Sequence, residues 1–212
     1  MSFKVILIST LLTGLAAAQP AIELPQPARK GGKPLMEALG ERKSSREFAA
    51  KKLPLEQLSN LLWAAYGVNR PGTGYRTAPS AHNRQTVDVY VAIPEGLYLY
   101  DAAKHRLQPV AAEDARAISG TQDFVAKAPL NLMYAAQMSK FERPAGVTEV
   151  EVHEWAAIEA GAIAQNVYLY CASEGLVTVV RAGVQREAFS KLAKLPADRR
   201  IVSAQTVGYP AP

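Results

Sequence analysis

Cysteine is scarce in this sequence: Cys171 is the only one among 212 residues. A single thiol excludes an intramolecular disulfide, so the hydrophobic core alone must stabilise the fold. Histidine is also rare, and His82, His105 and His153 lie far apart without metal-ligand spacing to a cysteine or an acidic residue. The G-x-S-x-G motif of serine hydrolases is absent. These absences disfavour a metal centre, a metalloenzyme and a hydrolase.

Concentrated positive charge is missing as well. The formal net charge is +5 and the pI is near 9.3, but the 24 lysines and arginines are spread along the chain. No basic helix is interleaved with aromatic residues, which disfavours a nucleic-acid partner and leaves room for a small anionic ligand. With 49% hydrophobic residues, the chain is long enough for one substantial core and short for two.

The N-terminus has the pattern of a secretory signal peptide. Lys4 precedes an apolar or small run from Val5 to Ala18, which ends in an A-x-A arrangement before Gln19. About 14 such residues are too few for a comfortable membrane span, and no stop-transfer charges follow. We therefore expect a signal peptide at 1–18, an exported periplasmic or secreted protein, and no stable membrane anchor after cleavage. The alternative is a signal that is retained as an anchor.

Residues 19–33 are rich in proline and glycine and lack periodicity, which predicts a flexible linker before a globular domain at 34–212. Apolar spacing within that domain predicts helices at 34–39, 54–66, 111–119, 122–127, 149–174 and 185–192, and strands at 87–93, 97–100, 130–136, 177–180 and 201–207. The irregular stretch 68–84 has the length of a functional or a disordered loop. Strands that alternate with helices indicate an α+β domain with a mixed sheet flanked by helices.

The segment 149–174 is the longest predicted helix, and it is apolar nearly all round. Between Trp155 and Ala172 only Glu159, Gln165 and Asn166 are strongly polar. A helix of this kind must be covered on all sides, so we expect it at the centre of a subunit core or of a dimer interface. Glu159 and Asn166 are seven positions apart and share a face, where their buried polar groups need partners. A purely structural role remains the alternative for both.

Two polar motifs are candidates for ligand binding. The stretch 42–48, R-K-S-S-R-E-F, offers guanidinium forks and hydroxyls that suit a phosphate, although a basic run is often only a solvated face. The stretch 78–85, A-P-S-A-H-N-R-Q, lies at the end of the irregular segment. Here His82 is either a substrate contact or a solvated loop residue.

These motifs carry a family resemblance. R-K-S-S-R-x-F, P-S-x-x-N-x-Q, a long helix with Q-N-x-x-L, then G-L before a strand and a glycine, and finally V-G-Y-P occur in this order between Leu35 and Pro210. The set resembles the FMN-dependent nitroreductase family, and most of all its SagB-type, azoline-oxidising dehydrogenase branch. The resemblance implies an obligate homodimer with a nitroreductase-like α+β fold, in which FMN lies at the subunit interface and both subunits contribute to each site.

The resemblance also implies roles for single residues. The phosphate and ribityl chain would be held by Arg42, Lys43, Ser44 and Arg46. The flavin would be reached from the other subunit by Pro79, Ser80, Asn83 and Gln85, and Glu159 would lie beside it on the long helix. A strand end formed by Arg181, Ala182 and Gly183 would turn its backbone N–H groups toward the flavin N5 edge. The chain departs from many members in having no basic residue after the final strand, where it ends in Pro210-Ala211-Pro212.

The function that follows is an FMN-dependent oxidoreductase working by a ping-pong mechanism between a donor and a small organic or quinone-like acceptor. The flavin supplies the redox chemistry, so no catalytic nucleophile or base is expected from the protein. NAD(P)H is not expected outside the cytoplasm, which leaves a quinol, a thiol, a small organic substrate or a redox partner protein as donor. The alternative is a non-catalytic exported module, flavin-binding or structural, that kept the fold.

Overall fold

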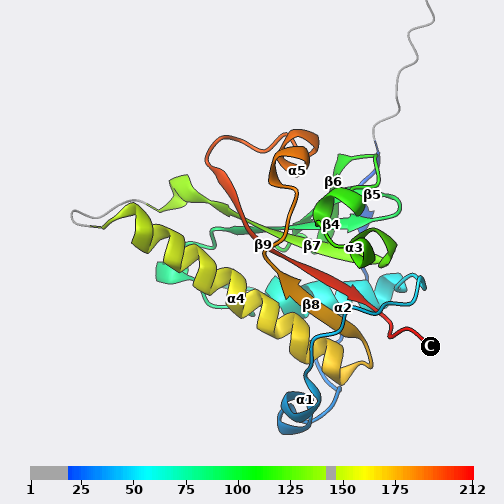
Figure 1. Cartoon of the computed structure of the whole chain (residues 1–212). Helices are drawn as coiled ribbons and strands as arrows, with labels where there is room; N and C mark the ends of the chain where they lie inside the picture. Colours follow the sequence, from blue (N-terminus) through cyan, green and yellow to red (C-terminus); the bar gives the residue numbers. More distant parts are fainter. Residues whose placement is uncertain (1–18, 142–146) are drawn as a thin grey trace, which may run out of the picture.

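The computed structural model describes residues 19–141 and 147–212, so the expected signal peptide lies outside the described residues. Figure 1 shows one large twisted sheet with helices on both of its faces. The sheet has seven strands in the order β1-β6-β5-β4-β7-β9-β8, and every pairing of neighbouring strands in it is antiparallel. The only parallel pairing in the described chain is an isolated bridge between Ser44 and Thr178. The α+β class with flanking helices is confirmed, and the expected mixture of strand directions is reduced to that bridge.

The strands of this sheet are β1 (Ile22–Glu23), β4 (Val87–Ile93), β5 (Gly96–Asp101), β6 (Arg106–Ala111), β7 (Leu130–Gln137), β8 (Val177–Arg181) and β9 (Arg199–Gly208), and a separate ribbon pairs β2 (Val68–Arg70) with β3 (Tyr75–Arg76). The α-helices are α1 (Leu35–Glu41), α2 (Leu55–Tyr66), α3 (Asp123–Lys127), α4 (Glu149–Ser173) and α5 (Arg186–Leu192). The described residues also form three 3₁₀ turns, namely η1 (Ala81–Asn83), η2 (Ala117–Ser119) and η3 (Met138–Lys140).

The central strands divide their side chains between two cores. Along β4, Val89 and Val91 pack with α2 and α4 on one face, whereas Tyr90 packs with Phe189 of α5 on the other. Successive residues of a strand point to opposite faces, so a strand covered on both faces is apolar at nearly every position. This explains why the central strands read as continuous hydrophobic runs.

Helix α4 begins with a capping box and buries one side against the sheet. The Thr148 hydroxyl accepts a hydrogen bond from the Glu151 backbone N–H, and the Glu151 carboxylate accepts one from the Thr148 backbone N–H. The opposite side faces solvent although it is also largely apolar: Ile158 is 67% exposed, and Ala157 and Gly161 are exposed beside it. An apolar outward face of this kind calls for a further covering element.

Residues 19–33 differ from the flexible linker that their composition predicts. Ile22 and Glu23 form β1 on the outer side of β6, and Leu24 is buried in the core. The Pro25 carbonyl accepts a hydrogen bond from Ser59, and the Lys33 backbone N–H donates to Ser173 over 2.9 Å. The expectation of a free tether is therefore wrong, because the edge of β6 and the flank of α2 supply partners that composition does not reveal.

The helix expected at 111–119 is also wrong. Residue 111 ends β6, and only the single turn η2 follows. The Asp114 carboxylate accepts hydrogen bonds from the Arg116 backbone N–H and guanidinium, and Arg116 donates further to the Ala128 carbonyl. Such local side-chain bonds compete with helix formation. Within residues 19–141 and 147–212, no helix combines the length and the apolar character needed to cross a membrane.

Candidate functional site

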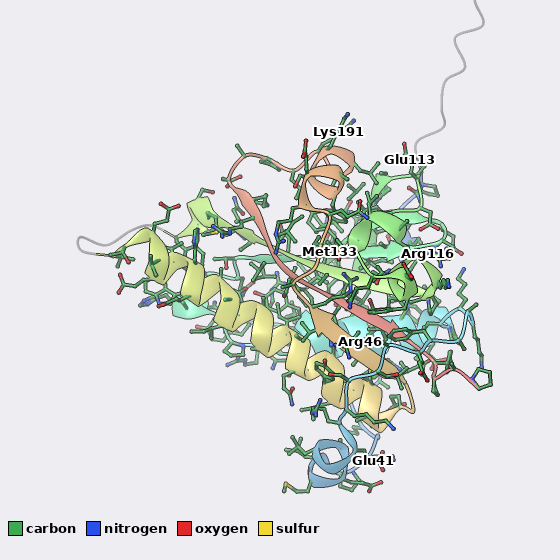
Figure 2. All side chains as sticks on the ribbon, viewed as in Figure 1. Glu41, Arg46, Glu113, Arg116, Met133 and Lys191 are labelled. Atoms are coloured by element: carbon green, nitrogen blue, oxygen red, sulfur yellow. The ribbon has the colours of Figure 1, made fainter. Side chains whose placement is uncertain are left out.

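The R-K-S-S-R segment follows α1 and runs beside β8. The helix ends where the Arg42 backbone N–H donates to the Ala38 carbonyl, and the chain then becomes extended. Ser44 bridges to Thr178, and the Ser45 backbone N–H donates to the Thr178 carbonyl over 3.0 Å. In Figure 2, Arg46 lies on this segment where it passes over β8. The sequence motif is thus held against the last strand of the sheet.

Tyr168 of α4 joins this segment to the end of β8. Its hydroxyl shares a hydrogen bond of 2.7 Å with the Ser44 hydroxyl and accepts a bond of 3.0 Å from the Val180 backbone N–H. The Arg42 guanidinium lies 5.2 Å from the centre of the Tyr168 ring, within range of a cation–π contact. Sequence reasoning missed Tyr168, although it carries the one hydroxyl inside the Q-N-x-x-L motif.

The surface built by these contacts is basic and open. Lys43, Ser44 and Arg46 are exposed and Arg42 is half-buried. Among the described residues, none of the three cations takes part in a salt bridge. Guanidinium groups without an acidic partner, next to a hydroxyl, form a donor set that suits a phosphate. We call Arg42, Lys43, Ser44 and Arg46 the basic shelf.

The end of β8 lies beside the basic shelf and is exposed as well. Val180 is 39% exposed, and Ala182 and Gly183 are exposed after it. Strand alternation turns the intervening Arg181 inward, so that only 8% of this residue is exposed. The expected strand end 181–183 is therefore present beside the shelf, with the Arg181 side chain on its inner side.

Residues 210–212, which follow the final strand, contain no basic side chain, but Lys51 from another part of the chain lies beside the end of that strand. The chain after β9 pairs with the chain after the shelf through a bridge between Phe48 and Pro210 and a bond from the Ala49 backbone N–H to the Tyr209 carbonyl. The Lys51 ammonium then sits 4.3 Å from the centre of the Tyr209 ring. Lys51 thus supplies a positive charge next to Tyr209, close to residues 210–212, which carry no charged side chain.

Arg181 donates to four acceptors inside the fold. Its Nε donates to the Thr206 hydroxyl over 3.0 Å and its Nη2 to Asn131 Oδ1 over 2.9 Å. Its Nη1 donates to the carbonyls of Ser119 and Gly183. No described carboxylate forms a salt bridge with this guanidinium, and burial lowers its pKa to about 10. The side chain thus remains charged at neutral pH without an acidic partner.

The second motif forms a strained loop. Three residues that are not glycine, His82, Asn83 and Gln85, have φ values of 52°, 53° and 49°. The loop is closed by the Ser80 hydroxyl, which accepts a bond from the Gln85 backbone N–H, and by Arg76, which donates to Gln85 Oε1 over 2.8 Å. Backbone strain of this kind persists only where surrounding contacts impose it, and it gathers at functional sites.

Within this loop, the exposed residues are Pro79, His82 and Asn83, while Ser80 and Gln85 are half-buried. Asn83 is therefore open to a ligand. The side chain of Gln85 is turned back into the loop by Arg76 and by its own bond to the Gly74 carbonyl.

Glu159 lies inside the fold and is only 1% exposed. Oε2 accepts hydrogen bonds from the backbone N–H and the hydroxyl of Thr86, and Oε1 accepts from the Val87 N–H and the Tyr66 hydroxyl. Burial raises the pKa of Tyr66, and the nearby Glu159 carboxylate raises it further, so the Tyr66 hydroxyl keeps its proton and remains a hydrogen-bond donor. Because protein donors occupy both oxygens, we assign Glu159 a structural role in place of the flavin contact expected from sequence. It anchors the chain that leaves the strained loop.

One copy of the chain keeps the shelf and the loop apart. The loop packs near the start of α4, where the His82 and Trp155 rings are 6.1 Å apart, whereas the shelf is joined to Tyr168. Tyr168 lies 13 positions after Trp155 on α4. With a rise of about 1.5 Å per residue, this spacing corresponds to roughly 20 Å along the helix. The two predicted halves of the site are therefore not assembled within a single copy.

Two larger cavities border α4. One of about 510 Å³ opens beside Lys43 and Tyr168 and is also lined by Gly175 and Leu176. The other, of about 520 Å³, lies between the segment 28–33, α2 and α4 and includes Trp63. The first adjoins the basic shelf, and the second does not include shelf residues.

Comparisons with known proteins identify the family of the chain. The family model described as the nitroreductase family matches residues 39–209. A curated protein of Methanocaldococcus jannaschii, provisionally named a nitroreductase, is 35% identical over 155 residues, which cover 68% of this chain and 76% of the relative. A crystal structure from Ralstonia eutropha JMP134, likewise provisionally named a nitroreductase, has a TM-score of 0.85 and 44% identity, with 93% of each chain covered.

A chain of the Escherichia coli microcin synthetase McbBCD complex shares the fold, with a TM-score of 0.68 at 20% identity, covering 99% of this chain and 85% of that one. The matched family region contains the shelf, the strained loop, α4 and the end of β8. By sequence and by fold, the chain belongs to the nitroreductase family, a membership that supports oxidoreductase activity.

Proposed function

We propose that this protein is an exported FMN-dependent oxidoreductase that works by a ping-pong mechanism between a donor and a small organic or quinone-like acceptor. The observation that carries the proposal is the basic shelf, whose exposed cations lack acidic partners among the described residues and which Tyr168 links to the exposed end of β8. Membership in the nitroreductase family supports a flavin as the cofactor. The SagB-type branch suggested by the sequence motifs is part of the proposal.

The residues present fit an FMN phosphate. Arg42 and Arg46 would bind the phosphate through charge-assisted hydrogen bonds. The Ser44 hydroxyl, which is held by Tyr168, would orient the ribityl chain of FMN next to the phosphate. The backbone of Val180–Gly183 would define one edge of the ring site. When bound, the flavin supplies hydride and electron transfer, while the protein supplies position and electrostatics.

A homodimer is the second part of the proposal. The shelf and the strained loop lie at different ends of α4, so a second copy must bring Asn83 and Pro79 to the shelf of the first. The exposed apolar side chains favour this arrangement, because Ile158 of α4 and Leu35 and Met36 of α1 are all more than half exposed in one copy. Apolar surfaces of this kind are typical of subunit interfaces.

Removal of the shelf charges tests the cofactor assignment. Arg42→Gln together with Arg46→Gln should lower FMN affinity at least about 100-fold, because each hydrogen bond to a charged group contributes about 1.5–3 kcal/mol. Lys104→Gln together with Lys191→Gln is the matched control, since it removes the same charge from exposed sites on the β5–β6 turn and on α5. Equal FMN affinity in both double variants would refute the assignment.

Redox cycling tests the enzymatic part. Protein loaded with FMN should be bleached by a donor in the absence of oxygen, and its flavin absorption should return when a quinone is added after the donor has been removed. A module that only carries flavin would keep its colour through both steps. The same assay with NADH, a quinol and a thiol would identify the class of donor.

A further inference from the structure

Arg181 combines three properties that are seldom found together. It is buried, it is charged, and no described carboxylate pairs with it. Its guanidinium is satisfied entirely by neutral acceptors on β7, β9, η2 and the Gly183 carbonyl. Buried charges are usually paired, because neutral hydrogen bonds replace hydration only in part. The positive charge is therefore open to compensation by an anionic group at the nearby surface.

The sequence neighbours of Arg181 form the exposed end of β8. Val180 precedes Arg181 and is 39% exposed, and Ala182 follows Arg181 in an exposed position. The charge thus lies on the inner side of the backbone segment Val180–Gly183. The Tyr168 hydroxyl joins the Val180 backbone N–H to the Ser44 hydroxyl, so the segment is linked to the basic shelf as well as lying in front of the Arg181 charge.

Hydrogen bonds from side chains inside the fold also hold the Val180–Gly183 segment in place. Arg181 ties the Gly183 carbonyl to the Ser119 carbonyl through one nitrogen, Nη1. The Gln185 side chain donates to the carbonyl of Gly120 over 2.9 Å, which joins the same two chain segments. A Cβ atom on Gly120 would come within 2.5 Å of Arg181 Nη1, so glycine at this position makes room for the guanidinium.

We propose that Arg181 is a positioning residue whose buried charge, behind the Val180–Gly183 segment, favours the reduced form of a flavin bound there. This inference rests on the proposed function. Reduction by a hydride donor transfers two electrons and one proton to the ring and leaves the flavin with one more negative charge than before. A fixed cation near the ring stabilises that charge and therefore raises the reduction potential of the bound cofactor.

The test measures the reduction potential of bound FMN in three proteins against a reference dye. Arg181→Gln removes the charge and should reduce the equilibrium constant for two-electron reduction about tenfold, which corresponds to about 30 mV. Arg181→Lys keeps the charge but cannot reproduce the fork of donors, so it should lower the melting temperature and leave the potential close to that of the wild type. Lys191→Gln, an exposed charge change on α5, should alter neither quantity.

The outcomes separate the possible failures. A purely structural role for Arg181 would lower the melting temperature of both Arg181 variants without changing the potential, and this result would overturn the inference. If Arg181→Gln does not fold, the wild type decides, because it must bind reduced FMN at least about tenfold more tightly than oxidised FMN. Equal affinities would contradict the inference. A wild type that binds no FMN would overturn the proposed function, and the inference with it.

Discussion

Replacement of Glu159 by glutamine tests the buried anchor between α4 and the strained loop. The carboxylate accepts four hydrogen bonds, two on each oxygen, from Tyr66, Thr86 and Val87. Glutamine keeps one acceptor oxygen and turns the other into an NH₂ donor, so two of the four donors lose their acceptor. Each buried donor left without a partner costs about 1–3 kcal/mol, which gives a loss of about 2–6 kcal/mol in the free energy of unfolding.

Such a loss is large compared with the total stability of about 5–15 kcal/mol that is usual for folded proteins. For a domain of this size, 1 kcal/mol lowers the melting temperature by about 2–4 °C, so Glu159→Gln should lower it by roughly 5–20 °C. The assay is thermal unfolding of the apo protein followed by circular dichroism. Weaker FMN binding should accompany the change, because Thr86 follows the strained loop directly.

Glu154→Gln is the matched control. Glu154 lies on the same helix, is exposed, and makes no hydrogen bond or ion pair among the described residues. Its replacement should change the melting temperature by no more than about 2 °C, as is usual for surface substitutions. If Glu159→Gln unfolded at the same temperature as this control, the hydrogen-bonded anchor would be wrong and the role of Glu159 would have to be sought elsewhere.

Three further predictions concern the shelf, the interface and the single thiol. Tyr168→Phe removes the hydroxyl between Ser44 and Val180, so it should lower the free energy of unfolding by about 1–3 kcal/mol and weaken FMN binding in a titration. Tyr75→Phe, at an exposed position, should change neither quantity. Ile158→Glu places a charge on the exposed apolar face of α4 and should shift sedimentation from dimer to monomer, with an unchanged fold by circular dichroism. Burial raises the pKa of the Cys171 thiol, so the unfolded chain releases this proton first as pH rises. The contribution of the thiol to the free energy of unfolding is therefore full below about pH 8.5 and falls above it. In urea titrations, Cys171→Val should lose less free energy of unfolding between pH 8 and pH 10 than the wild type does.

Much of the fold could be predicted from the sequence because its strongest signals are local. Two apolar runs on either side of Pro94-Glu95-Gly96 mark the hairpin of β4 and β5, a long apolar run marks helix α4, and the structure confirms both. The strand β6 was not predicted. It contains Pro109, which removes a backbone donor, and it pairs with β5 through a register shift, so its strand character depends on its neighbours.

The site was harder to predict, for a physical reason. Residue types can indicate a phosphate shelf, but they do not reveal which polar side chains are already occupied by the protein. Glu159 and Arg181 are the examples, since the sequence marks each as a candidate site residue and the structure buries each among protein partners. The left-handed backbone of His82, Asn83 and Gln85 likewise depends on hydrogen bonds from Arg76 and to Ser80, and no sequence pattern connects Arg76 to the loop.

The central claim is that each FMN site combines the basic shelf of one copy with the strained loop of another. Subunit complementation tests it most directly. One variant carries Arg42→Gln and Arg46→Gln, and the other carries Asn83→Ala with Pro79→Gly. Each variant alone should retain little flavin after desalting. When the two are unfolded, mixed and refolded together, each mixed dimer should regain one intact site, and flavin absorption should rise toward one FMN per mixed dimer. A mixture that binds no more flavin than its separate components would contradict the shared site.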